Sequence, residues 1–492
     1  MVKEVLVDVG IGEIRLAALE NGQPVEIYIE KKDHESLVGN IYRGKVERVL
    51  PGMQAAFVDI GLEKNAFLYV KDVIPVSYND EGELLFSGED FSDISEVLSC
   101  GEEISVQVIK DATGNKGPRV STRLSLPGRY CVTMPHSNVF GISKRITDQN
   151  ERKRLRQIFE KAKPENVGII VRTAAENVLE EQLIEDMEEL EALCRGLALK
   201  EQKGAVPRLI YREPDIISHA IREYLKADTD RFLINNREEY EKVLALLGDA
   251  APGLKTKVQY FSKNYDMFAY YHVESALEEA LSRKVWLKSG AYLIFDRTEA
   301  LSVIDVNSGK FVGKSDLEET ALKINLEAAK EIAHQIRLRN LSGIIIIDFI
   351  DMHQRDHRDQ VVQTLKEAVK TDRTQTVVVD MTNLGLVELT RKKIRQPLYK
   401  SFTVDCRVCH GTGYYISPVT AARRIEKRID SQMAEAGHGC LEVYVHPEIL
   451  RVLETSEKDS VENLKTRYNC GLKLISSKDA DYDEAFIRKI EI

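Results

Sequence analysis

Two apolar segments on either side of a helical pattern, between residues 300 and 352, constrain the fold more than any other part of the sequence. The first, ALSVIDVNSG, alternates like a strand, and the second, GIIIIDFIDM, is the continuous apolar run expected of a buried strand. A capping box over 315–318 opens the helical pattern between them. Its apolar residues are Leu317, Ala321, Ile324, Ala328, Ile332 and Ile336. A strand, a helix and a strand in this order predict a parallel crossover.

Three polar side chains stand where these two strands end. Asp305 and Asn307 are two residues apart and share one face of the first strand, and Asp348 closes the second. Because parallel strands finish at the same sheet edge, we expect the three side chains to lie together. Neighbouring carboxylates repel each other without a counter-ion, and hard oxygen ligands suit Mg²⁺ or Mn²⁺. A divalent ion here would activate water against a phosphodiester.

A structural role is the alternative, in which each aspartate only caps a helix or a turn at the sheet edge. Three converging groups favour a site over this role. Asp380 ends the apolar run TVVVD and falls at the same edge. The sequence leaves open whether Asp380 joins the metal site or serves the next turn.

The seven cysteines are an odd number and are scattered, which excludes a disulfide scaffold. Only Cys406 and Cys409 stand close together, in a C-x-x-C knuckle followed by two glycines. Structural zinc needs four ligands, the chain has no second C-x-x-C, and His410 is poorly placed beside Cys409. We therefore expect two chains to share one Zn²⁺ on a two-fold axis. A thioredoxin-like redox pair is the alternative.

Residues 38 to 124 form a β-rich block whose five short strands suit a small barrel. Strand alternation turns Phe57 and Phe67 away from the apolar positions beside them. Aromatic residues in this position stack unpaired bases in oligonucleotide-binding barrels, and Lys116, in a basic turn, is a candidate phosphate contact. A place in the core explains the two phenylalanines equally well.

The charge distribution excludes a protein that coats nucleic acid by bulk charge, since 69 basic and 79 acidic residues give a net charge of −10. Nine of the acidic residues lie in 77–103, a segment without Lys or Arg, which predicts a solvated insertion in the barrel. No segment approaches the ~20 apolar residues of a membrane span. The opening MVKEVLVDVG lacks the apolar core of a signal peptide, so we expect a cytoplasmic protein.

Seven segments, in order along the chain, closely resemble those of the ribonuclease E/G family of bacterial endoribonucleases. They are GNIYRGKVERVLPGMQAAFVDIG, GISKRI, VRTAAE, VIDVNSG, GIIIIDFIDM, GLVELTRKK and CRVCHGTG. The resemblance covers roughly residues 1 to 415, and the length is most similar to that of members without a long disordered C-terminal scaffold. The zinc motif departs from the family pattern, because Arg407 stands where the family usually has Pro.

The resemblance implies a magnesium-dependent endoribonuclease that cleaves single-stranded RNA and leaves 5′-phosphate and 3′-hydroxyl ends. Its roles would be rRNA and tRNA processing and mRNA decay, and a 5′-monophosphate on the substrate would stimulate it. Two other functions stay open: a non-catalytic RNA-binding scaffold, and a metal-dependent phosphodiesterase acting on DNA. The intact Asp305, Asn307 and Asp348 argue against the first. The match to a 5′-sensor argues against the second.

The resemblance also assigns roles to individual residues. It implies that Asp305 and Asp348 hold one catalytic Mg²⁺, with Mn²⁺ as a substitute, and that Asn307 supports them. It implies that Cys406 and Cys409 share one Zn²⁺ per dimer, with a dimer of dimers as a further state. The 5′-monophosphate sensor would comprise Gly128, Val132, Arg172 and Thr173, and the RNA contacts would be Phe57, Phe67 and Lys116. The basic run 391–395 matches a family segment that could contact phosphate, although a solvated helix face is equally credible.

The implied fold is a multidomain α/β (α+β) architecture. An RNase H-like subdomain is split by an OB-fold barrel and a 5′-sensor domain, and a DNase I-like catalytic domain, a zinc link and a small C-terminal α/β domain follow. The expected boundaries are 1–37 and 215–280 for the split subdomain, 38–124 for the barrel, 125–214 for the sensor, 281–400 for the catalytic domain, 401–414 for the zinc link and 415–492 for the last domain.

Overall fold

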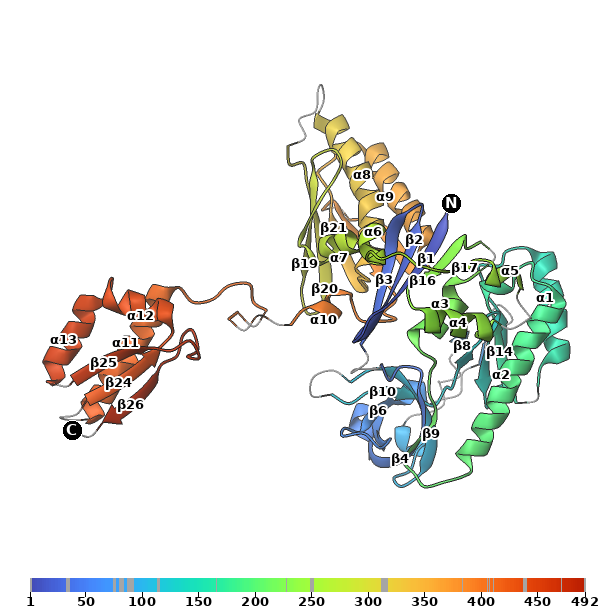
Figure 1. The fold of residues 1–492 in the computed structure, drawn as a ribbon, viewed down its shortest axis with the longest axis horizontal. Coiled ribbons are helices and arrows are strands. Elements are labelled where there is room, and N and C mark those ends of the chain that lie inside the picture. Colours follow the sequence, from blue (N-terminus) through green and yellow to red (C-terminus); the bar gives the residue numbers. More distant parts are fainter. Residues whose placement is uncertain are drawn as a thin grey trace. The chain divides into compact units, whose positions relative to one another are not determined.

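The computed structural model contains two compact units, residues 1–401 and 402–492, each of mixed α/β type (Figure 1). It describes residues 2–31, 36–73, 77–78, 84–85, 93–112, 116–164, 166–226, 228–247, 252–310, 317–382, 384–404, 406, 408–409, 411–436, 440–469 and 471–490. None of the helices in these residues is long and apolar enough to cross a membrane.

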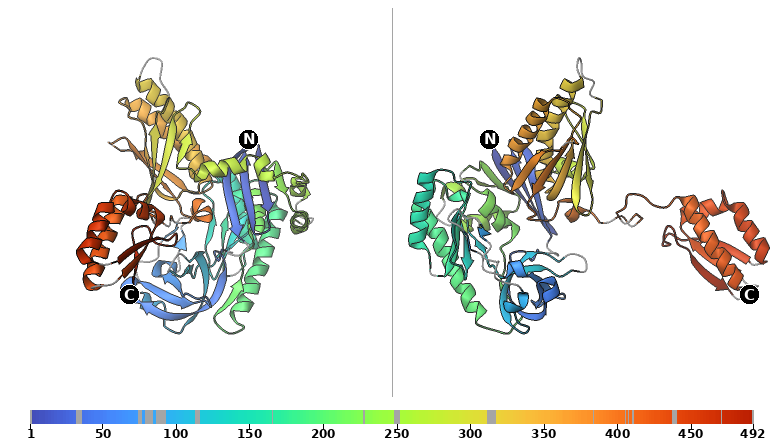
Figure 2. Two further views of the ribbon diagram at one scale, coloured as in Figure 1. Left: turned by 60° about the vertical axis from the view of Figure 1, so that its left-hand side comes forward. Right: turned by 180° about the vertical axis from the view of Figure 1, so that it is seen from behind.

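The first sheet of unit 1 joins strands from two distant parts of the chain. Its order is β17 (Val258–Tyr260), β16 (Arg231–Ile234), β1 (Lys3–Val9), β2 (Glu13–Glu20) and β3 (Gln23–Lys31). β1 pairs in parallel with β16, from Glu4 beside Arg231 to Val7 beside Ile234. The blue N-terminal strands accordingly lie beside green elements in both views of Figure 2. Residues 215–280 thus contribute two strands, β16 and β17, to the sheet of the N-terminal strands.

Helices complete this part of the chain. They are α3 (Ile216–Tyr224), α4 (Arg237–Leu246), α5 (Pro252–Lys255), α6 (Met267–Tyr270) and α7 (Val273–Leu281). Asp215 caps the start of α3, where its carboxylate accepts a hydrogen bond from the backbone N–H of Ser218. Its apolar residues recur at helical spacing and pack against Val5 and Val7 of β1 in one buried core.

A closed barrel of five strands follows, as the sequence predicts. The strands are β4 (Ile41–Leu50), β5 (Ala55–Asp59), β6 (Ala66–Tyr69), β10 (Arg119–Ser121) and β9 (Glu103–Lys110), with the 3₁₀ turns η1 (Pro51–Met53) and η2 (Val70–Asp72) between them. The pairing of β4 with β9 closes the barrel, and a later strand, β15 (Arg208–Tyr211), adds to the edge of β4.

The acidic insertion 77–103 is not a solvated loop throughout. Its described residues form the short pair β7 (Ser77–Tyr78) and β8 (Leu84–Leu85) and the 3₁₀ turn η3 (Ile94–Glu96). Ile94 and Leu98 are buried in the barrel core, so the solvated interpretation is wrong for this end of the segment. These two apolar residues, four positions apart, are surrounded in the sequence by acidic residues, which is why the composition of the segment predicted a solvated loop.

Residues 126–201 form a four-stranded sheet and two helices. The strand order is β11 (Leu126–Pro127), β12 (Cys131–Pro135), β14 (Val167–Val171) and β13 (Phe140–Ile142). The helices α1 (Gln149–Ala162) and α2 (Glu180–Glu201) pack together over the sheet around one core. A 3₁₀ turn, η4 (Thr173–Ala175), lies between β14 and α2.

The last sheet of unit 1 contains the strand, helix and strand predicted between residues 300 and 352. Its order is β18 (Lys284–Trp286), β19 (Tyr292–Arg297), β20 (Leu301–Asn307), β21 (Gly343–Asp348), β23 (Leu386–Arg391) and β22 (Thr376–Met381). β20 and β21 pair in parallel with α8 (Leu317–Leu338) between them, which confirms the predicted crossover. Ser315 and Asp316 of the expected capping box lie outside the described residues.

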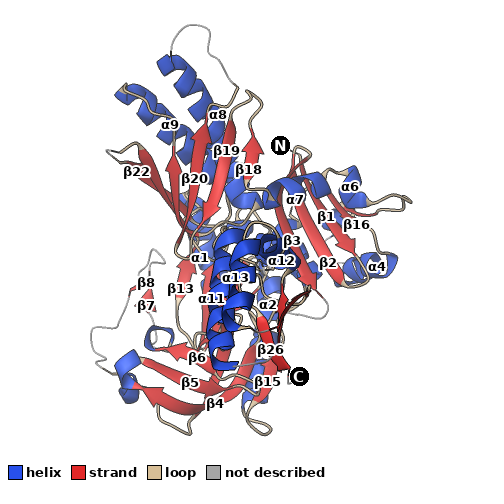
Figure 3. Cartoon of the chain, turned by 90° about the vertical axis from the view of Figure 1, so that its left-hand side faces the viewer, coloured by secondary structure: helices blue, strands red, loops and turns tan. Residues whose placement is uncertain are grey.

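One face of this sheet is covered and the other is open. α8 and α9 (Arg355–Ala368) lie side by side against the covered face (Figure 3), and a 3₁₀ turn, η5 (Val369–Thr371), follows α9. Ile345 and Ile347 are completely buried beneath the helices, whereas Ile344 is 49% exposed on the open face. The predicted apolar strand therefore forms as β21 and ends at Asp348, and only the face toward the helices is buried. The short helix α10 (Tyr399–Phe402) ends the segment.

Unit 2 is a three-stranded sheet with helices packed on one face. The sheet order is β25 (Gly471–Ser476), β24 (Cys440–Val445) and β26 (Phe486–Ile490), and the helices are α11 (Pro418–Ala436), α12 (Pro447–Glu454) and α13 (Lys458–Tyr468). Ala421, Ile425 and Ile429 of α11 recur at helical spacing and are fully buried in the core of this unit.

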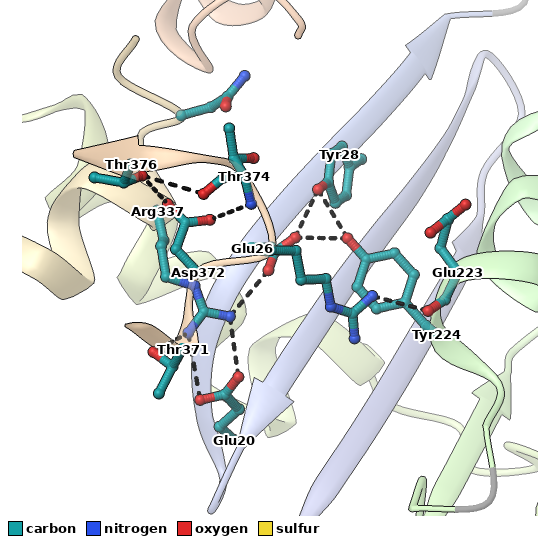
Figure 4. A network of polar contacts seen from close by, with 12 residues as sticks. Glu20, Glu26, Tyr28, Glu223, Tyr224, Arg337, Thr371, Asp372, Thr374 and Thr376 are labelled. Carbon is teal, nitrogen blue, oxygen red and sulfur yellow. Dashed lines mark hydrogen bonds and ion pairs between the residues drawn. The ribbon is translucent and has the colours of Figure 1, made fainter. Parts of the chain in front are cut away.

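A buried polar network joins the first sheet to α8 (Figure 4). Arg337 of α8 donates to Glu20 of β2 and Glu26 of β3, each at 2.9 Å. The hydroxyls of Tyr28 and Tyr224 donate to Glu26, each at 2.6 Å. Burial raises the pKa of Glu26, but the nearby Arg373, Arg337 and the two hydroxyls outweigh it and lower that pKa to about 2. Glu26 is therefore an ion-paired carboxylate at neutral pH.

Candidate functional site

The parallel pairing of β20 and β21 places Asp305 directly beside Asp348. Their neighbours Ile304 and Ile347 are fully buried beneath the helices, so strand alternation turns both aspartates to the open face. Asn307, two residues after Asp305, donates its side-chain N–H to Asp305 Oδ2 at 2.8 Å. The three residues that the sequence singled out are therefore brought together, and the amide fixes the orientation of one carboxylate.

The ionised form of Asp348 is disfavoured. Burial, Asp305 and Asp351 all raise the pKa of Asp348. Among the described residues, no three or more His, Cys, Asp and Glu side chains form a metal-binding cluster. Mg²⁺ does not require one, because it keeps several waters and is commonly held by one or two carboxylates together with substrate phosphate. The pair Asp305 and Asp348, with mutual repulsion that a cation would relieve, fits that ion.

Asp380 lies at the same sheet edge but does not adjoin the pair. It belongs to β22, and β23 lies between β22 and β21. Neighbouring strands are ~4.8 Å apart, so two strand spacings place Asp380 ~10 Å from β21. Its carboxylate accepts a hydrogen bond from the backbone N–H of Met381. This arrangement favours the turn role that the sequence left open.

Two residues that the sequence did not single out hold the chain immediately after Asp348. Asn325 of α8 is fully buried; its amide donates to the Ile350 carbonyl at 2.8 Å and accepts from the Ile350 N–H at 3.1 Å. Glu318 accepts the backbone N–H groups of His353 and Gln354 at 3.0 and 2.9 Å. The sequence does contain a signal for Asn325, because a polar amide directly after Ile324 in the apolar stripe of the predicted helix indicates a buried hydrogen-bonding role.

The predicted sensor residues lie together at one end of the four-stranded sheet. Arg172 donates through Nη1 to the carbonyl of Gly128 at 2.9 Å and through Nη2 to both oxygens of Glu223 at 2.7 and 2.6 Å. Thr173 Oγ1 lies 3.1 Å from Ser143 Oγ. Val132 pairs with Ile170, two residues before Arg172. The ion pair with Glu223 therefore holds the Arg172 guanidinium beside Gly128.

The backbone at Gly128 approaches two side chains of α2 closely. A Cβ here would lie 2.6 Å from Leu190 Cδ1 and 2.7 Å from Asp186 Oδ2. Asp186 of α2 accepts the backbone N–H groups of Arg129 and Tyr130, each at 2.9 Å, and so fixes the loop that follows. Asp186 and Glu223 were missed, because nothing in the sequence distinguishes one acid of a charged helix from its solvated neighbours.

The barrel presents its two phenylalanines as the alternation predicts. Phe57 pairs with Phe67 across β5 and β6, and their rings meet edge to face with centroids 6.0 Å apart. The adjacent Val58 and Leu68 are fully buried, whereas both rings are only half-buried. Lys116 is exposed in a turn that packs tightly, since a Cβ on Gly117 would lie 2.0 Å from the Asn65 carbonyl oxygen. The turn thus sits beside the start of β6.

The basic run 391–395 is neither a helix nor uniformly solvated. Arg391 ends β23, is 5% exposed and donates to Asp372 at 2.7 Å. Arg395 contacts His219 at 2.8 Å and lies over the Tyr28 ring, 4.5 Å from its centroid. The helix-face interpretation is therefore wrong, and Arg391 is a structural ion pair. Lys392 and Lys393 are exposed.

The C-x-x-C pair lies at the start of unit 2. Cys406 is exposed and Cys409 partly buried. Backbone N–H groups of Cys409 and Val408 donate to the Cys406 sulfur and lower the pKa of its thiol, with a further contribution from the Cys409 side chain. A lowered pKa favours the thiolate, which is the form that ligates zinc. Arg407 and His410 lie outside the described residues.

Comparisons with known proteins agree with these motifs. The model of the ribonuclease E/G family matches residues 125–394. Ribonuclease G of Salmonella typhimurium (strain SL1344) is 38% identical over 467 residues, which cover 94% of this chain and 95% of that protein. Ribonuclease G of Haemophilus influenzae is 41% identical over 430 residues, 87% of each chain. Ribonuclease E of Nostoc sp. is 37% identical over 423 residues, 85% of this chain and 60% of that protein. The chain therefore belongs to the ribonuclease E/G family.

Proposed function

We propose that this endoribonuclease hydrolyses single-stranded RNA with one Mg²⁺ held by Asp305 and Asp348, and that it leaves 5′-phosphate and 3′-hydroxyl ends. The register of Asp305 beside Asp348, with Asn307 bonded to Asp305, is the observation that carries the proposal. When bound, the divalent cation supplies positive charge that polarises a water molecule and stabilises the charge developing on the phosphate. Mn²⁺ prefers the same oxygen ligands and is the expected substitute.

The protein's own contribution is to fix the two carboxylates before RNA arrives. Asn307 orients Asp305, while Asn325 and Glu318 hold the chain just beyond Asp348. Preorganised groups spend no free energy on reorientation during the reaction. Phe57 and Phe67 would hold the strand unpaired, because each stacked base contributes ~1–3 kcal/mol of binding free energy. The substrates would be ribosomal, transfer and messenger RNAs in the cytoplasm.

A 5′-monophosphate on the RNA is the proposed activating feature. A guanidinium has five N–H donors, and its bonds to Gly128 and Glu223 leave Arg172 with donors to spare. Charge-assisted hydrogen bonds from these donors and from the Thr173 hydroxyl suit a terminal phosphate. Gly128 and Val132 form the adjoining wall.

One assay tests the activity and the sensor together. The full chain and the Arg172→Gln variant are incubated with Mg²⁺ and three matched strands: 5′-monophosphorylated RNA, 5′-hydroxyl RNA and DNA. We expect the wild type to cleave both RNAs, with kcat/KM about 10- to 100-fold higher for the monophosphorylated one, because a charge-assisted bond contributes ~1.5–3 kcal/mol. In Arg172→Gln that ratio is expected to fall close to one, with the 5′-hydroxyl rate retained.

The control is Arg195→Gln, which removes the same charge from an exposed position on α2 and should keep the wild-type ratio. Binding of RNA without cleavage would support the non-catalytic scaffold instead. Cleavage of the DNA strand at the RNA rate would support the DNA phosphodiesterase. A wild-type ratio of one would reject the sensor assignment and leave the endoribonuclease proposal standing.

Zinc is proposed to link two chains through Cys406 and Cys409 of each, with a dimer of dimers as a further state. The double change Cys406→Ser and Cys409→Ser is expected to remove the metal and convert the dimer to monomers, because four thiolates complete one tetrahedral site. Sedimentation and zinc analysis of the purified protein measure both effects. Cys100→Ser, at another exposed cysteine, should change neither. A zinc-free dimer of unchanged stability would contradict the shared site.

A further inference from the structure

A solvent-open cavity of about 640 Å³ lies against the first two turns of α1. We call it the α1 cavity and define it by its lining residues, Ile142, Lys144, Ile146, Thr147, Gln149, Arg152, Lys153 and Arg156. Four of these carry positive charge and none is acidic. In a chain whose net charge is −10, four cations around one hollow without a carboxylate in its wall indicate a site for an anion.

The acidic residues of α1 and its cap each have a partner. Asp148 accepts the backbone N–H of Asn150 at the start of α1. Glu151 is held by Arg154, which donates to both of its oxygens at 2.8 Å. Glu160 is 4.0 Å from Arg156 in an exposed pair, which contributes little binding free energy in water. None of these acids lines the cavity, so its wall carries four basic side chains and no carboxylate.

The cations have different local roles. Arg152 donates to the carbonyls of Ser143 and Ile146 at 3.0 and 3.1 Å, and so braces the loop that forms one wall. Arg156 lies over the Phe140 ring, 5.7 Å from its centroid. Lys153 is exposed. Lys153 and Arg156, almost one helical turn apart, present charges along the axis of α1 rather than at one point.

The cavity adjoins the residues assigned to the 5′-sensor. Its wall residue Ile142 pairs with Val171, and the next residue, Ser143, accounts for the 3.1 Å contact with Thr173. Lys144 then begins the cavity loop. An RNA whose first phosphate lies at Arg172 and Thr173 can therefore continue into a volume several times larger than a single phosphate needs.

We infer that the α1 cavity binds the phosphodiester backbone of the RNA nucleotides next to the 5′ end. The identification of the anion as RNA rests on the proposed function, whereas the anion site itself rests on the cavity and its charges. Contacts to backbone phosphate carry no sequence information and do not depend on the chemistry of the 5′ end. The site would therefore strengthen the binding of 5′-monophosphorylated and 5′-hydroxyl RNA alike.

The test measures RNA binding by the full chain without added Mg²⁺, so that the strand is not cleaved and the zinc is not removed, over a range of monovalent salt concentrations. In the double variant Lys153→Gln and Arg156→Gln, the slope of log K against log salt is expected to become shallower by ~1.4, at ~0.7 for each phosphate of the single strand that the variant no longer neutralises. By the same relation, affinity at about 0.1 M salt falls roughly 10- to 30-fold for both RNA ends. Lys153→Gln alone, at an exposed residue, should change the slope by about half as much.

The matched control is the double variant Lys161→Gln and Lys203→Gln, which removes two exposed charges outside the cavity. An unchanged slope in the cavity variant, or an equal change in the control, would overturn the inference. The inference would also be overturned if the cavity variant bound inorganic phosphate more weakly but bound RNA as well as the wild type does. That result would make the cavity a site for small anions. If the wild type does not distinguish the two RNA ends, the sensor proposal fails. The slopes of log K against log salt then still show whether the α1 cavity binds RNA. If it binds neither RNA, both proposals are wrong.

Discussion

Replacing Asp348 by Asn is expected to lower the rate of RNA cleavage by about 10³-fold or more at saturating Mg²⁺. The change removes one of the two carboxylates that lie side by side on β20 and β21. Loss of metal-based stabilisation of the transition state costs several kcal/mol, and each 1.36 kcal/mol is a tenfold change in rate. Single-turnover cleavage of a 5′-monophosphorylated RNA measures the effect without interference from product release.

Stability separates a functional loss from misfolding in this variant. Burial, Asp305 and Asp351 already raise the pKa of Asp348, so its ionised form is disfavoured in the folded protein. Neutralising it relieves repulsion, and the free energy of unfolding is expected to stay equal or rise. Asp380→Asn, at the same sheet edge but on β22, is the matched control and should retain cleavage. Wild-type activity in Asp348→Asn would remove the metal assignment.

Replacing Arg337 by Met is expected to lower the free energy of unfolding of unit 1 by about 3–5 kcal/mol. The Arg337 side chain is only 6% exposed and joins Glu20 to Glu26, whose side chain is 8% exposed. Breaking a buried ion pair leaves the partner charge buried and less compensated, which is why the cost exceeds that of a surface pair. Urea unfolding of the full chain, followed by a signal from unit 1, gives the difference.

Acid should diminish this difference in a defined pH window. The pKa of Glu26 is lowered from 4.5 to about 2 in the folded chain, so its ion pairing stabilises the protein fully above about pH 4.5 and is lost as the pH falls toward 2. The gap between the wild type and Arg337→Met should narrow over that window. Arg355→Met, at an arginine that is 93% exposed, should cost less than about 0.5 kcal/mol at any pH. A gap that persists unchanged to pH 2 would argue against Glu26 as the titrating partner.

Local periodicity explains what the sequence could predict. The spacing of apolar residues in α8 and the alternation in β20 are properties of short segments, and the parallel pairing that unites Asp305 with Asp348 follows from them. The outward positions of Phe57 and Phe67 follow from strand alternation in the same way. No partner distant in sequence had to be known.

Partners distant in sequence account for the errors. The sequence predicts a solvated Arg391 because its ion-pair partner, Asp372, is 19 residues away, in the turn before β22. Glu26 and Arg337 are 311 positions apart, and no local pattern relates them. Ile94 and Leu98 were assigned to a solvated loop because the acidic residues around them dominate the composition, although burial is decided side chain by side chain.

The first sheet has a consequence for how the chain folds during synthesis. β1 needs β16 as its parallel neighbour, and the two meet only when Arg231 has followed Glu4 out of the ribosome. At ~5–20 residues per second that delay is roughly 10–45 s, long enough for the barrel between them to fold first. Until then the edge of β1 is exposed and able to pair wrongly, so a nascent chain stalled before residue 231 should be a better chaperone substrate than one stalled after residue 260.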